Sequence, residues 1–429
     1  MTSSIRNVLF GTFTLRFSTG LTGGLLAFYL GHLERHGGET ISPETFAVLY
    51  AAFYATELVG SPIFGLLSDR LGHHRVMQYG PIFGAVAVVL TGLTTNLVVI
   101  GGTRVLEGAA AAASIPSILG FLAMSTASNE DLRGKVSARF ELATLAGIGG
   151  GAIAAGILFD GIPGMLPGLG ANAFFLNALI YGVSFLIYRY GVSAPDEKAA
   201  TERKPHYGWK RYARLLKNSH IWLLAPTWIA VNAAIGVYSG QGLFNLVRTK
   251  DVRFSDQLLA GGLSGLEVTL GFVVAGAVFV AGLIYWGNRF NTTRRTTILF
   301  YGILGGAVLV AGALAFNHSG GLDPIFRTPF ALVAGFGLFV LAGATPAALG
   351  LLADMSEAYP DDRGAVMGLY SVFLGIGQIL GSFIGGFAAE RAAIDGLLIA
   401  TLVMMGVALL PLYQLRQYEH HLDGVPHAS

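Results

Sequence analysis

The sequence predicts an all-α integral membrane protein whose twelve transmembrane helices form two six-helix bundles. Three observations predict this fold: the composition is apolar, twelve stretches are long enough to cross a bilayer, and the two halves of the chain share a repeat. Of the 429 residues, 53% are hydrophobic and 12% are charged, whereas a soluble protein carries about 25% charged residues. The composition therefore excludes a soluble enzyme, a disordered chain and a nucleic-acid-binding protein.

Other features of the composition agree with this class. The chain has no cysteine, which excludes a disulfide scaffold. Its net charge of +2 is too small to indicate an acidic binding partner. Its 60 glycines fit closely packed transmembrane helices, because small residues let two backbones approach each other.

The elements of this fold are twelve apolar stretches separated mostly by short polar segments. A helix that crosses a bilayer needs about 20 mostly apolar residues. The first stretch follows Arg6 but is longer than a typical signal-peptide core, and no small-residue cleavage site follows it, so we predict a retained span. The predicted spans are 8–32, 45–67, 76–95, 97–125, 135–159, 173–192, 220–246, 260–286, 296–316, 329–352, 364–388 and 396–415.

The distribution of positive charge predicts the orientation of these spans. With the N-terminus inside, most of the 27 Lys and Arg residues fall on the inner side, and Arg16 and Arg104 fall within spans. The positive-inside rule then places both termini in the cytoplasm. An even number of spans also requires both termini on one side, so we expect an integral protein of the plasma (inner) membrane.

A polar segment near the middle divides the chain into a bundle at 1–192, a linker at 193–219 and a bundle at 220–429. Within the linker, Trp209, Tyr212, Leu215 and Leu216 recur at helical spacing among basic residues. This pattern predicts a basic amphipathic helix on the inner leaflet. The alternative is a solvated linker whose charges only set the topology.

An internal repeat supports the division into halves. Arg133-Gly134 opens the fifth span, and Arg363-Gly364 opens the eleventh, 230 positions later. Parallel six-span halves are typical of transporters with a site at the bilayer midplane between them. Glycines at the same offset predict one face of each helix against which another helix packs closely. These pairs are Gly147 and Gly377, Gly151 and Gly381, and Gly156 and Gly386.

The loop after the second span carries the most specific motif. It reads Gly-Leu-Leu-Ser-Asp-Arg-Leu-Gly-His-His-Arg over residues 65–75. It resembles the signature loop Gly-x-x-x-Asp-Arg-x-Gly-Arg-Arg of the major facilitator superfamily, with His73 and His74 at basic positions. The fourth span carries Arg104-Val-Leu-Glu107-Gly, similar to the Arg-x-x-Gln-Gly element of that family, and Asp354 through Arg363-Gly364 resembles the start of its eleventh span.

The resemblance covers nearly the whole chain and is greatest to the twelve-span drug:proton antiporter branch, through Ser61-Pro62 running into Gly65. Two features depart from that branch. The usual proline is missing from the glycine motif of the fifth span, and Met124 stands where an acid often ends the fourth span. Glu130 or Asp131 is a candidate to replace that acid.

The resemblance implies a cytoplasmic gate built from the signature loop and its counterpart. We expect Asp69 to cap the positive end of the eleventh span and Arg75 to pair with an acid below the fourth span. The alternative is that Arg70 and Arg75 are only topology signals. The candidate gating residues are Gly65, Asp69, Arg70, Gly72, Arg75, Asp354 and Arg363.

Four charged residues fall deep in the predicted spans: Arg16, Glu57, Arg104 and Glu107. At 1.5 Å per residue they lie about 12–18 Å from the span ends. Ionisable groups at such depth are costly and usually functional, so they are candidates for proton coupling or substrate contact. The alternative is a static ion-paired cluster, in which Glu107 simply neutralises Arg104 one turn away. Glu267 is the comparable acid of the second half, unless it lies near the outer surface.

The second half also offers polar and aromatic candidates for a substrate cavity. Aromatic groups beside acids suit a lipophilic cation, whereas buried arginines suit a carboxylate or phosphate, so the charge of the substrate stays open. The candidates are Trp228, Asn232, Tyr238, Gln241, Asn245 and Gln378, with a helix break at Ala344-Thr345-Pro346 in the tenth span.

These features together predict a secondary transporter that works by alternating access. We favour proton-driven efflux of lipophilic organic compounds. The alternatives are a proton symporter or uniporter for an organic anion, sugar or other small metabolite, and a non-transporting sensor on the same fold. The sequence shows no metal cluster, nucleophile elbow or phosphate loop, so we expect no enzyme activity, cofactor or metal. The expected partners are membrane lipids, protons and a small-molecule substrate, with no nucleic acid, and we expect a monomer.

Overall fold

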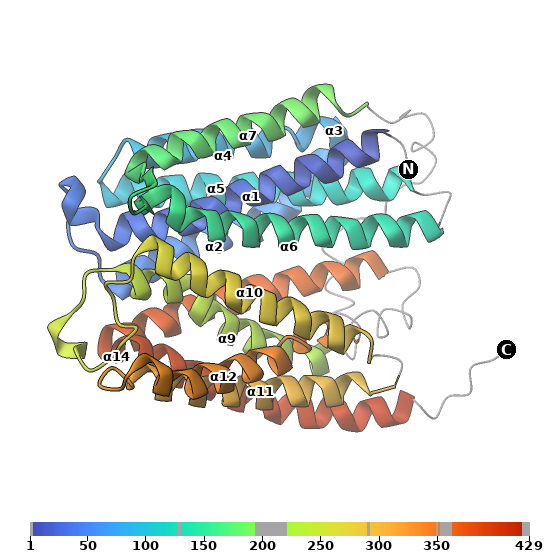
Figure 1. The fold of residues 1–429 in the computed structure, drawn as a ribbon. Helices are drawn as coiled ribbons and strands as arrows, with labels where there is room; N and C mark the ends of the chain where they lie inside the picture. The colour runs from blue at the N-terminus through green and yellow to red at the C-terminus, as the bar shows by residue number, and fades with distance from the viewer. Residues whose placement is uncertain are drawn as a thin grey trace. The chain divides into compact units, whose positions relative to one another are not determined.

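A computed structural model describes residues 3–126, 130–193, 221–289, 292–348, 351 and 363–422, and these residues are almost entirely helical (Figure 1). The long helices of the first half are α1 (Ser3–Gly31), α2 (Pro43–Leu71), α4 (Tyr79–Gly92), α5 (Leu97–Ser125), α6 (Glu130–Asp160) and α7 (Ala173–Tyr190). Those of the second half are α9 (Ile221–Val247), α10 (Gly265–Gly287), α11 (Arg295–Asn317), α12 (Pro324–Leu341) and α14 (Arg363–Leu422).

Short elements connect the long helices. They are the single-turn helices η1 (Leu33–His36), α3 (His73–Val76), η2 (Gly170–Asn172) and η4 (Val252–Phe254), and the hairpin of β1 (Gly161–Ile162) and β2 (Leu166–Pro167). The two strands are antiparallel, with Gly161 opposite Pro167.

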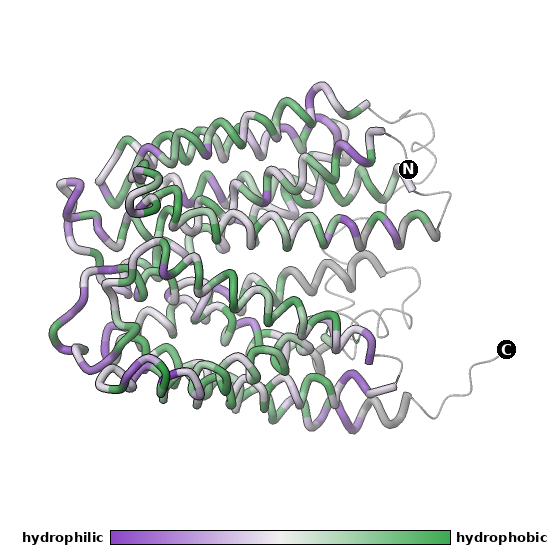
Figure 2. Tube along the Cα trace, in the orientation of Figure 1, coloured by the Kyte–Doolittle hydropathy of each residue, from purple (hydrophilic) through white to green (hydrophobic). Residues whose placement is uncertain are grey.

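Each predicted span falls on one of the long helices, and α14 contains the last two. Within the described residues, eight stretches are both long and apolar enough to cross a membrane. The stretch at α14 counts once although it covers two predicted spans, and α4 has 14 residues, fewer than a full crossing. The helices α1 and α9 are long enough but are not among the eight. Figure 2 shows hydrophobic residues along the helices and hydrophilic residues gathered towards their connecting ends.

Ala392 and Ala393 break α14 into two helical segments. Ala393 has a φ of 47°, which L-residues other than glycine rarely adopt, and Ala392 is also non-helical. The side chain of Gln257 fixes this break, because its Nε2 donates to the carbonyl of Ala392 (3.0 Å) and its Oε1 accepts from the backbone of Ile394 (3.0 Å). The turn therefore lies between positions 388 and 396, where the sequence predicts a connection between two spans.

The predicted break in the tenth span is present close to its expected position. α12 ends at Leu341, a turn follows at Ala342 and Gly343, and residues 344–348 are helical again. Pro346 has no N–H to donate to the carbonyl of Ala342, which removes one helical hydrogen bond at this point. The interruption therefore lies in the turn just before the Ala344-Thr345-Pro346 segment.

Packing divides the chain into two compact units. The first contains Met1–Pro205, Val247–Thr249 and Leu263–Leu270, and the second contains His206–Leu246, Lys250–Gly262 and Gly271–Ser429. The predicted domain limits stay predictions, and the linker from 194 to 219 lies outside the described residues.

Closely packed glycines hold the first unit together. α1 packs along α6 and α7, and α5 packs along α2 and α4. A side chain at Gly147 or Gly151 of α6 would meet the backbone of Phe13 or Phe17, and Gly20 of α1 lies equally close to Ile148. These contacts confirm the predicted close-packing face of the fifth span.

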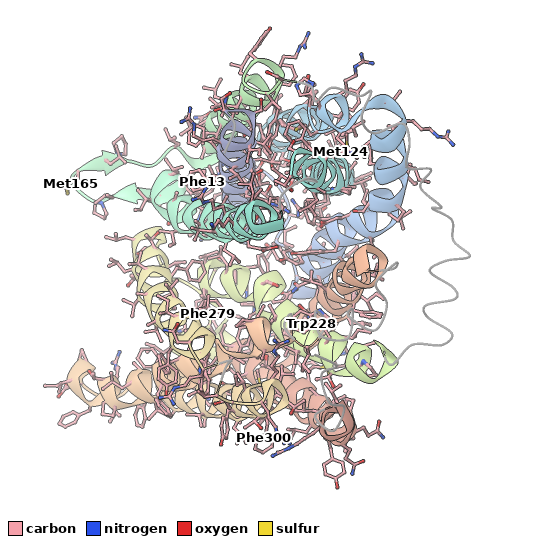
Figure 3. All side chains as sticks on the ribbon, turned by 90° about the vertical axis from the view of Figure 1, so that its right-hand side faces the viewer. Phe13, Met124, Met165, Trp228, Phe279 and Phe300 are labelled. Atoms are coloured by element: carbon pink, nitrogen blue, oxygen red, sulfur yellow. The ribbon has the colours of Figure 1, made fainter. Side chains whose placement is uncertain are left out.

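The second unit repeats this packing. A side chain at Gly377 of α14 would meet the side chain of Asn232 and the carbonyl of Ile229, and Gly381 lies against Ala233. α14 therefore packs on α9 as α6 packs on α1, which gives the repeat at 230 positions a structural cause. The unit has an apolar core around Trp228, against which Phe300 packs (Figure 3).

Candidate functional site

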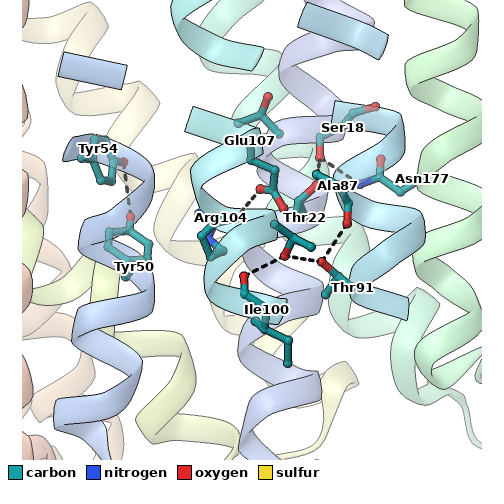
Figure 4. Close-up of polar contacts among 12 residues, drawn as sticks. Ser18, Thr22, Tyr50, Tyr54, Ala87, Thr91, Ile100, Arg104, Glu107 and Asn177 are labelled. Carbon is teal, nitrogen blue, oxygen red and sulfur yellow. Dashed lines mark hydrogen bonds and ion pairs between the residues drawn. The ribbon is translucent and has the colours of Figure 1, made fainter. Parts of the chain in front are cut away.

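Arg104 and Glu107 form a buried ion pair one turn apart on α5. The helix starts where the side chain of Asn96 accepts hydrogen bonds from the N–H groups of Val98 and Val99. Arg104 Nη1 donates to Glu107 Oε2 (Figure 4), and each residue is 4% exposed. The guanidinium also lies over the ring of Phe53, 5.0 Å from its centre. Each charge therefore offsets part of the cost of burying the other.

The other two deep charges lie in the same neighbourhood. Arg16 of α1 is half-buried and interacts electrostatically with the carboxylates of Glu57 on α2 and Glu141 on α6. Arg16 and Glu107 line the same small cavity. The structure thus brings together the four charged residues that the sequence places deep in its spans.

Tyrosines and an additional acid extend this cluster beyond the predicted residues. The hydroxyls of Tyr50 and Tyr54 lie 3.3 Å apart (Figure 4), and Tyr54 interacts electrostatically with Glu57. Tyr181 of α7 is buried and lines the cavity. Along α2, Tyr54 follows Tyr50 by four positions, and Glu57 follows Tyr54 by three. This helical spacing is a signal that sequence reasoning missed. The additional acid is Glu141 of α6, which interacts electrostatically with Arg16.

Hydroxyl and amide groups join α7 to α1 beside the cluster. Asn177 Nδ2 donates to the carbonyl of Ser18 (3.1 Å) and to Thr22 Oγ1 (2.8 Å), and Ser184 Oγ donates to Thr14 Oγ1 (2.7 Å). Asn177, Ser184 and Thr22 are fully buried. These bonds fix α7, and with it Tyr181, against α1.

The cavity candidates of the second half make hydrogen bonds within α9 and between α9 and α14. Asn232 Nδ2 donates to the carbonyl of Trp228 (2.9 Å), Asn245 Nδ2 donates to Gln241 Oε1 (3.1 Å), and Gln378 Oε1 accepts from Ser239 (2.7 Å). Tyr238 alone of the predicted candidates is half-buried; the remainder are buried: Trp228, Asn232, Gln241, Asn245 and Gln378.

The structure corrects the predicted depth of Glu267. The helix α10 begins at Gly265, five residues later than the predicted span, so Glu267 lies exposed in its first turn. Its Oε2 accepts from the backbone N–H (2.8 Å) and hydroxyl (2.7 Å) of Ser264. The pair forms a capping box, whose pattern Ser-x-x-Glu is visible in the sequence. Glu267 thus caps the start of α10 and does not join the buried charges. This position agrees with the alternative that Glu267 lies near the surface.

The signature motif at 65–75 begins within the last turns of α2, which ends at Leu71. Gly72 has a φ of 93° and donates its N–H to the carbonyl of Ser68 (3.0 Å), a left-handed cap that favours glycine. Gly65 precedes it on α2, and Arg70 and Arg75 are exposed. Asp354 and the side chains of Asp69 and Arg363 lie outside the described part of the chain, so the predicted gate contacts stay predictions.

The two histidines that replace basic residues attach the loop to the first unit. His73 Nδ1 lies 3.1 Å from Ser68 Oγ, and its ring packs at Gly120 of α5. His74 Nε2 lies 2.9 Å from the carbonyl of Tyr188, near the end of α7. Within the described residues no group of three His, Cys, Asp or Glu side chains is placed to hold a metal.

The long helices form two units, the repeat packs alike in both, and the first unit contains a buried charge cluster. These features define a polytopic membrane transport protein. The family model of the Major Facilitator Superfamily matches residues 8–322. The chain belongs to the major facilitator superfamily and is an integral membrane protein with its twelve-helix fold.

Similar proteins agree with this membership. The chain is 24% identical over 348 residues to Multidrug resistance protein 2 of Bacillus subtilis (strain 168). This alignment covers 81% of this chain and 80% of the relative. It is 24% identical over 392 residues to Quinolone resistance protein NorA of Staphylococcus aureus (strain MRSA252), covering 90% of each. The crystal structure of nucleoside transporter NupG aligns with a TM-score of 0.69 and 14% identity over 97% of this chain and 99% of NupG, a likeness of fold.

Proposed function

We propose that the protein exports lipophilic organic compounds in exchange for protons by alternating access. The observation that carries this proposal is the buried pair of Arg104 and Glu107, with Arg16 and Glu57 beside it. Burial disfavours a charged carboxylate, and a neighbouring arginine favours it. Both effects change when water reaches the pair, so a conformational change can load or release a proton there.

The relatives support the organic substrate. Their names describe multidrug resistance and quinolone resistance, which is the effect of export. A half-buried aromatic residue beside an acid, such as Tyr54 beside Glu57, suits a lipophilic cation.

The remaining parts of the proposal follow from the class of protein. The protein works as a transporter and has no enzymatic activity, metal or cofactor. It lies in the plasma membrane as a monomer with both termini in the cytoplasm, and its partners are lipids, protons and a small-molecule substrate.

Transport in liposomes tests the proposal. The purified protein is reconstituted, a pH gradient is imposed, and movement of a fluorescent lipophilic cation against its gradient is recorded. We expect the wild-type protein to drive this movement and Glu107→Gln to reduce it to the level of empty liposomes. Glu39→Gln is the matched control, because it makes the same chemical change at an exposed loop position. Equal transport by Glu107→Gln and wild type would remove Glu107 from the coupling step.

A second candidate function rests on Arg16. Its guanidinium is half-buried, and such a fork matches a substrate carboxylate. Proton symport of an organic anion is therefore the alternative. In the same liposomes it would appear as accumulation of an organic anion on the alkaline side, lost in Arg16→Ala, with no movement of the cation.

A further inference from the structure

A small cavity lies inside the first unit, next to the buried ion pair. One face of α5 lines it through Glu107, Ala111 and Ser114, which are four and three positions apart. α1 contributes Arg16 and Thr19, and α7 contributes Tyr181. α2 contributes Phe53, so the cavity lies where four helices meet, entirely within one packed unit.

The size of the cavity limits what it can hold. Its volume is about 10 Å³, which is close to the space that one water molecule occupies by this measure. A drug-sized ligand needs hundreds of Å³. In this conformation the cavity is therefore too small to hold an organic substrate.

Apolar and polar side chains line the cavity in equal number, and the polar groups leave one acceptor unused. Glu107 Oε2 accepts from Arg104, but Glu107 Oε1 is buried and has no hydrogen-bond partner among the described residues. An unsatisfied buried acceptor costs about 1–3 kcal/mol, and more when it is charged. Such a group in a partly polar cavity indicates a bound hydrogen-bond donor.

The neighbouring hydroxyls offer acceptors as well. Thr19 Oγ1 donates to the carbonyl of Leu15 (3.0 Å), and Ser114 Oγ donates to the carbonyl of Ala110 (2.9 Å). Both protons are therefore in use, so towards any further partner these hydroxyls can act only as acceptors. A water molecule matches this set, because it has two protons for acceptors and two lone pairs for a donor such as Arg16.

We infer that this cavity binds one water molecule, which donates a hydrogen bond to Glu107 Oε1 and is the group through which protons reach that carboxylate. Because proton uptake by Glu107 belongs to the proposed function, this relay depends on it. A proton that arrives on the water as H₃O⁺ passes to Oε1: one O–H bond of H₃O⁺ breaks, one O–H bond forms on the carboxyl group, and neutral water stays in the cavity.

Infrared difference spectroscopy of the full-length protein in liposomes tests this site. Spectra are recorded across a pH step in ordinary water and in water enriched in heavy oxygen. We expect an O–H stretching band that changes with the pH step and shifts with the oxygen isotope. Ala111→Val fills the cavity and should abolish this band. Ala109→Val is the control, because Ala109 is on the same helix, half-buried and outside the cavity lining.

A milder variant covers the case in which Ala111→Val does not fold. Ala111→Ser adds a single oxygen to the cavity and should also abolish the isotope-sensitive band. The inference is overturned if wild type shows no such band, or if the band persists in either filled variant. Proton-driven transport without the band would overturn the water site alone, whereas the band without proton-driven transport would overturn the proposed function alone.

Discussion

At the scale of single residues, the ion pair of Arg104 and Glu107 is the feature that tolerates a single substitution least. Two charges that are each 4% exposed depend on each other, because removing one leaves the other buried without a counter-charge. Replacing both with apolar groups removes that penalty. The pair therefore allows stability and function to be separated by mutation.

We expect Glu107→Ala to lower the free energy of unfolding by about 3–5 kcal/mol, the cost of an uncompensated buried charge. The double variant Arg104→Met with Glu107→Leu should recover most of this loss and yet carry out no proton-driven transport. Unfolding in denaturant, followed by circular dichroism, measures the first effect. A double variant as unstable as Glu107→Ala would show that the pair contributes more than mutual neutralisation.

His32 gives the stability of the first unit a dependence on pH. It follows the last residue of α1, and burial, aided by the charge of Arg35, lowers its pKa below the usual value. The folded protein therefore keeps His32 neutral at a pH where the unfolded chain, with a histidine pKa of about 6.5, already binds a proton. Stability is then lost as the pH falls below about 6.5.

We expect His32→Gln to flatten the pH dependence of the thermal midpoint between about pH 5 and 7, measured by scanning fluorimetry in detergent. His36→Gln is the control, because His36 is exposed four residues along the chain. A slope in His32→Gln equal to that of wild type would assign the pH dependence to another group.

The sequence predicts part of this residue-scale arrangement. A spacing of three on an apolar helix is enough to predict that Arg104 and Glu107 share a face. The proximity of Arg16 to Glu57 and Glu141 depends on how three helices pack, and no spacing within one helix specifies it. Tyr181 has no charge and no distinctive spacing, so only the packed structure identifies it as a neighbour of Glu107.

At the scale of elements, glycine contacts decide how α1 and α6 meet. A side chain at Gly151 would collide with backbone atoms of Phe17 and Leu21, which cannot move aside as a flexible side chain can. Gly149, two residues earlier on the same helix, is exposed and has open space around it.

We expect Gly151→Leu to destabilise the protein by about 1–3 kcal/mol or more, because α1 and α6 must separate to admit the side chain. Gly149→Leu should leave the thermal midpoint near that of wild type. The comparison is made in one detergent by scanning fluorimetry. Equal losses in the two variants would mean that the close contact between α1 and α6 does not set the effect.

Helix ends are where sequence-based prediction of the elements is weakest. Hydropathy alone extends the eighth span back to residue 260, although Ser264 and Glu267 mark the true start of α10. No glycine or proline stands at the break at Ala393. The break is fixed by Gln257, which belongs to another segment. Local chemistry thus predicts the first of these boundaries. The sequence also predicts a connection between residues 388 and 396, but only long-range contacts explain the backbone conformation of the break there.

At the scale of the whole molecule, the repeat predicts two halves built alike, and both units show it. Gly151 and Gly381 occupy equivalent places against the first helix of each half. The orientation of the molecule in the membrane follows from positive charge alone and is directly testable, because the chain contains no cysteine.

We expect a single cysteine at Gly321→Cys to react with an impermeant maleimide added to intact cells, since the predicted orientation puts this loop outside. Thr292→Cys should react only after the cells are permeabilised. Both positions are exposed, and labelling of the cysteine-free parent gives the background. The reverse pattern would place both termini outside.

The neutrality of the Arg104–Glu107 pair has an electrical consequence. With both groups charged, displacement of the first unit across the membrane field moves no net charge at this point. Once Glu107 takes up the transported proton, Arg104 carries an unbalanced positive charge, on which the field does work of about 2.3 kcal/mol per 100 mV for a full crossing. In the proposed exchange, the membrane voltage therefore acts through this pair on the step that carries the proton, whereas the step that carries the substrate moves no net charge at this pair.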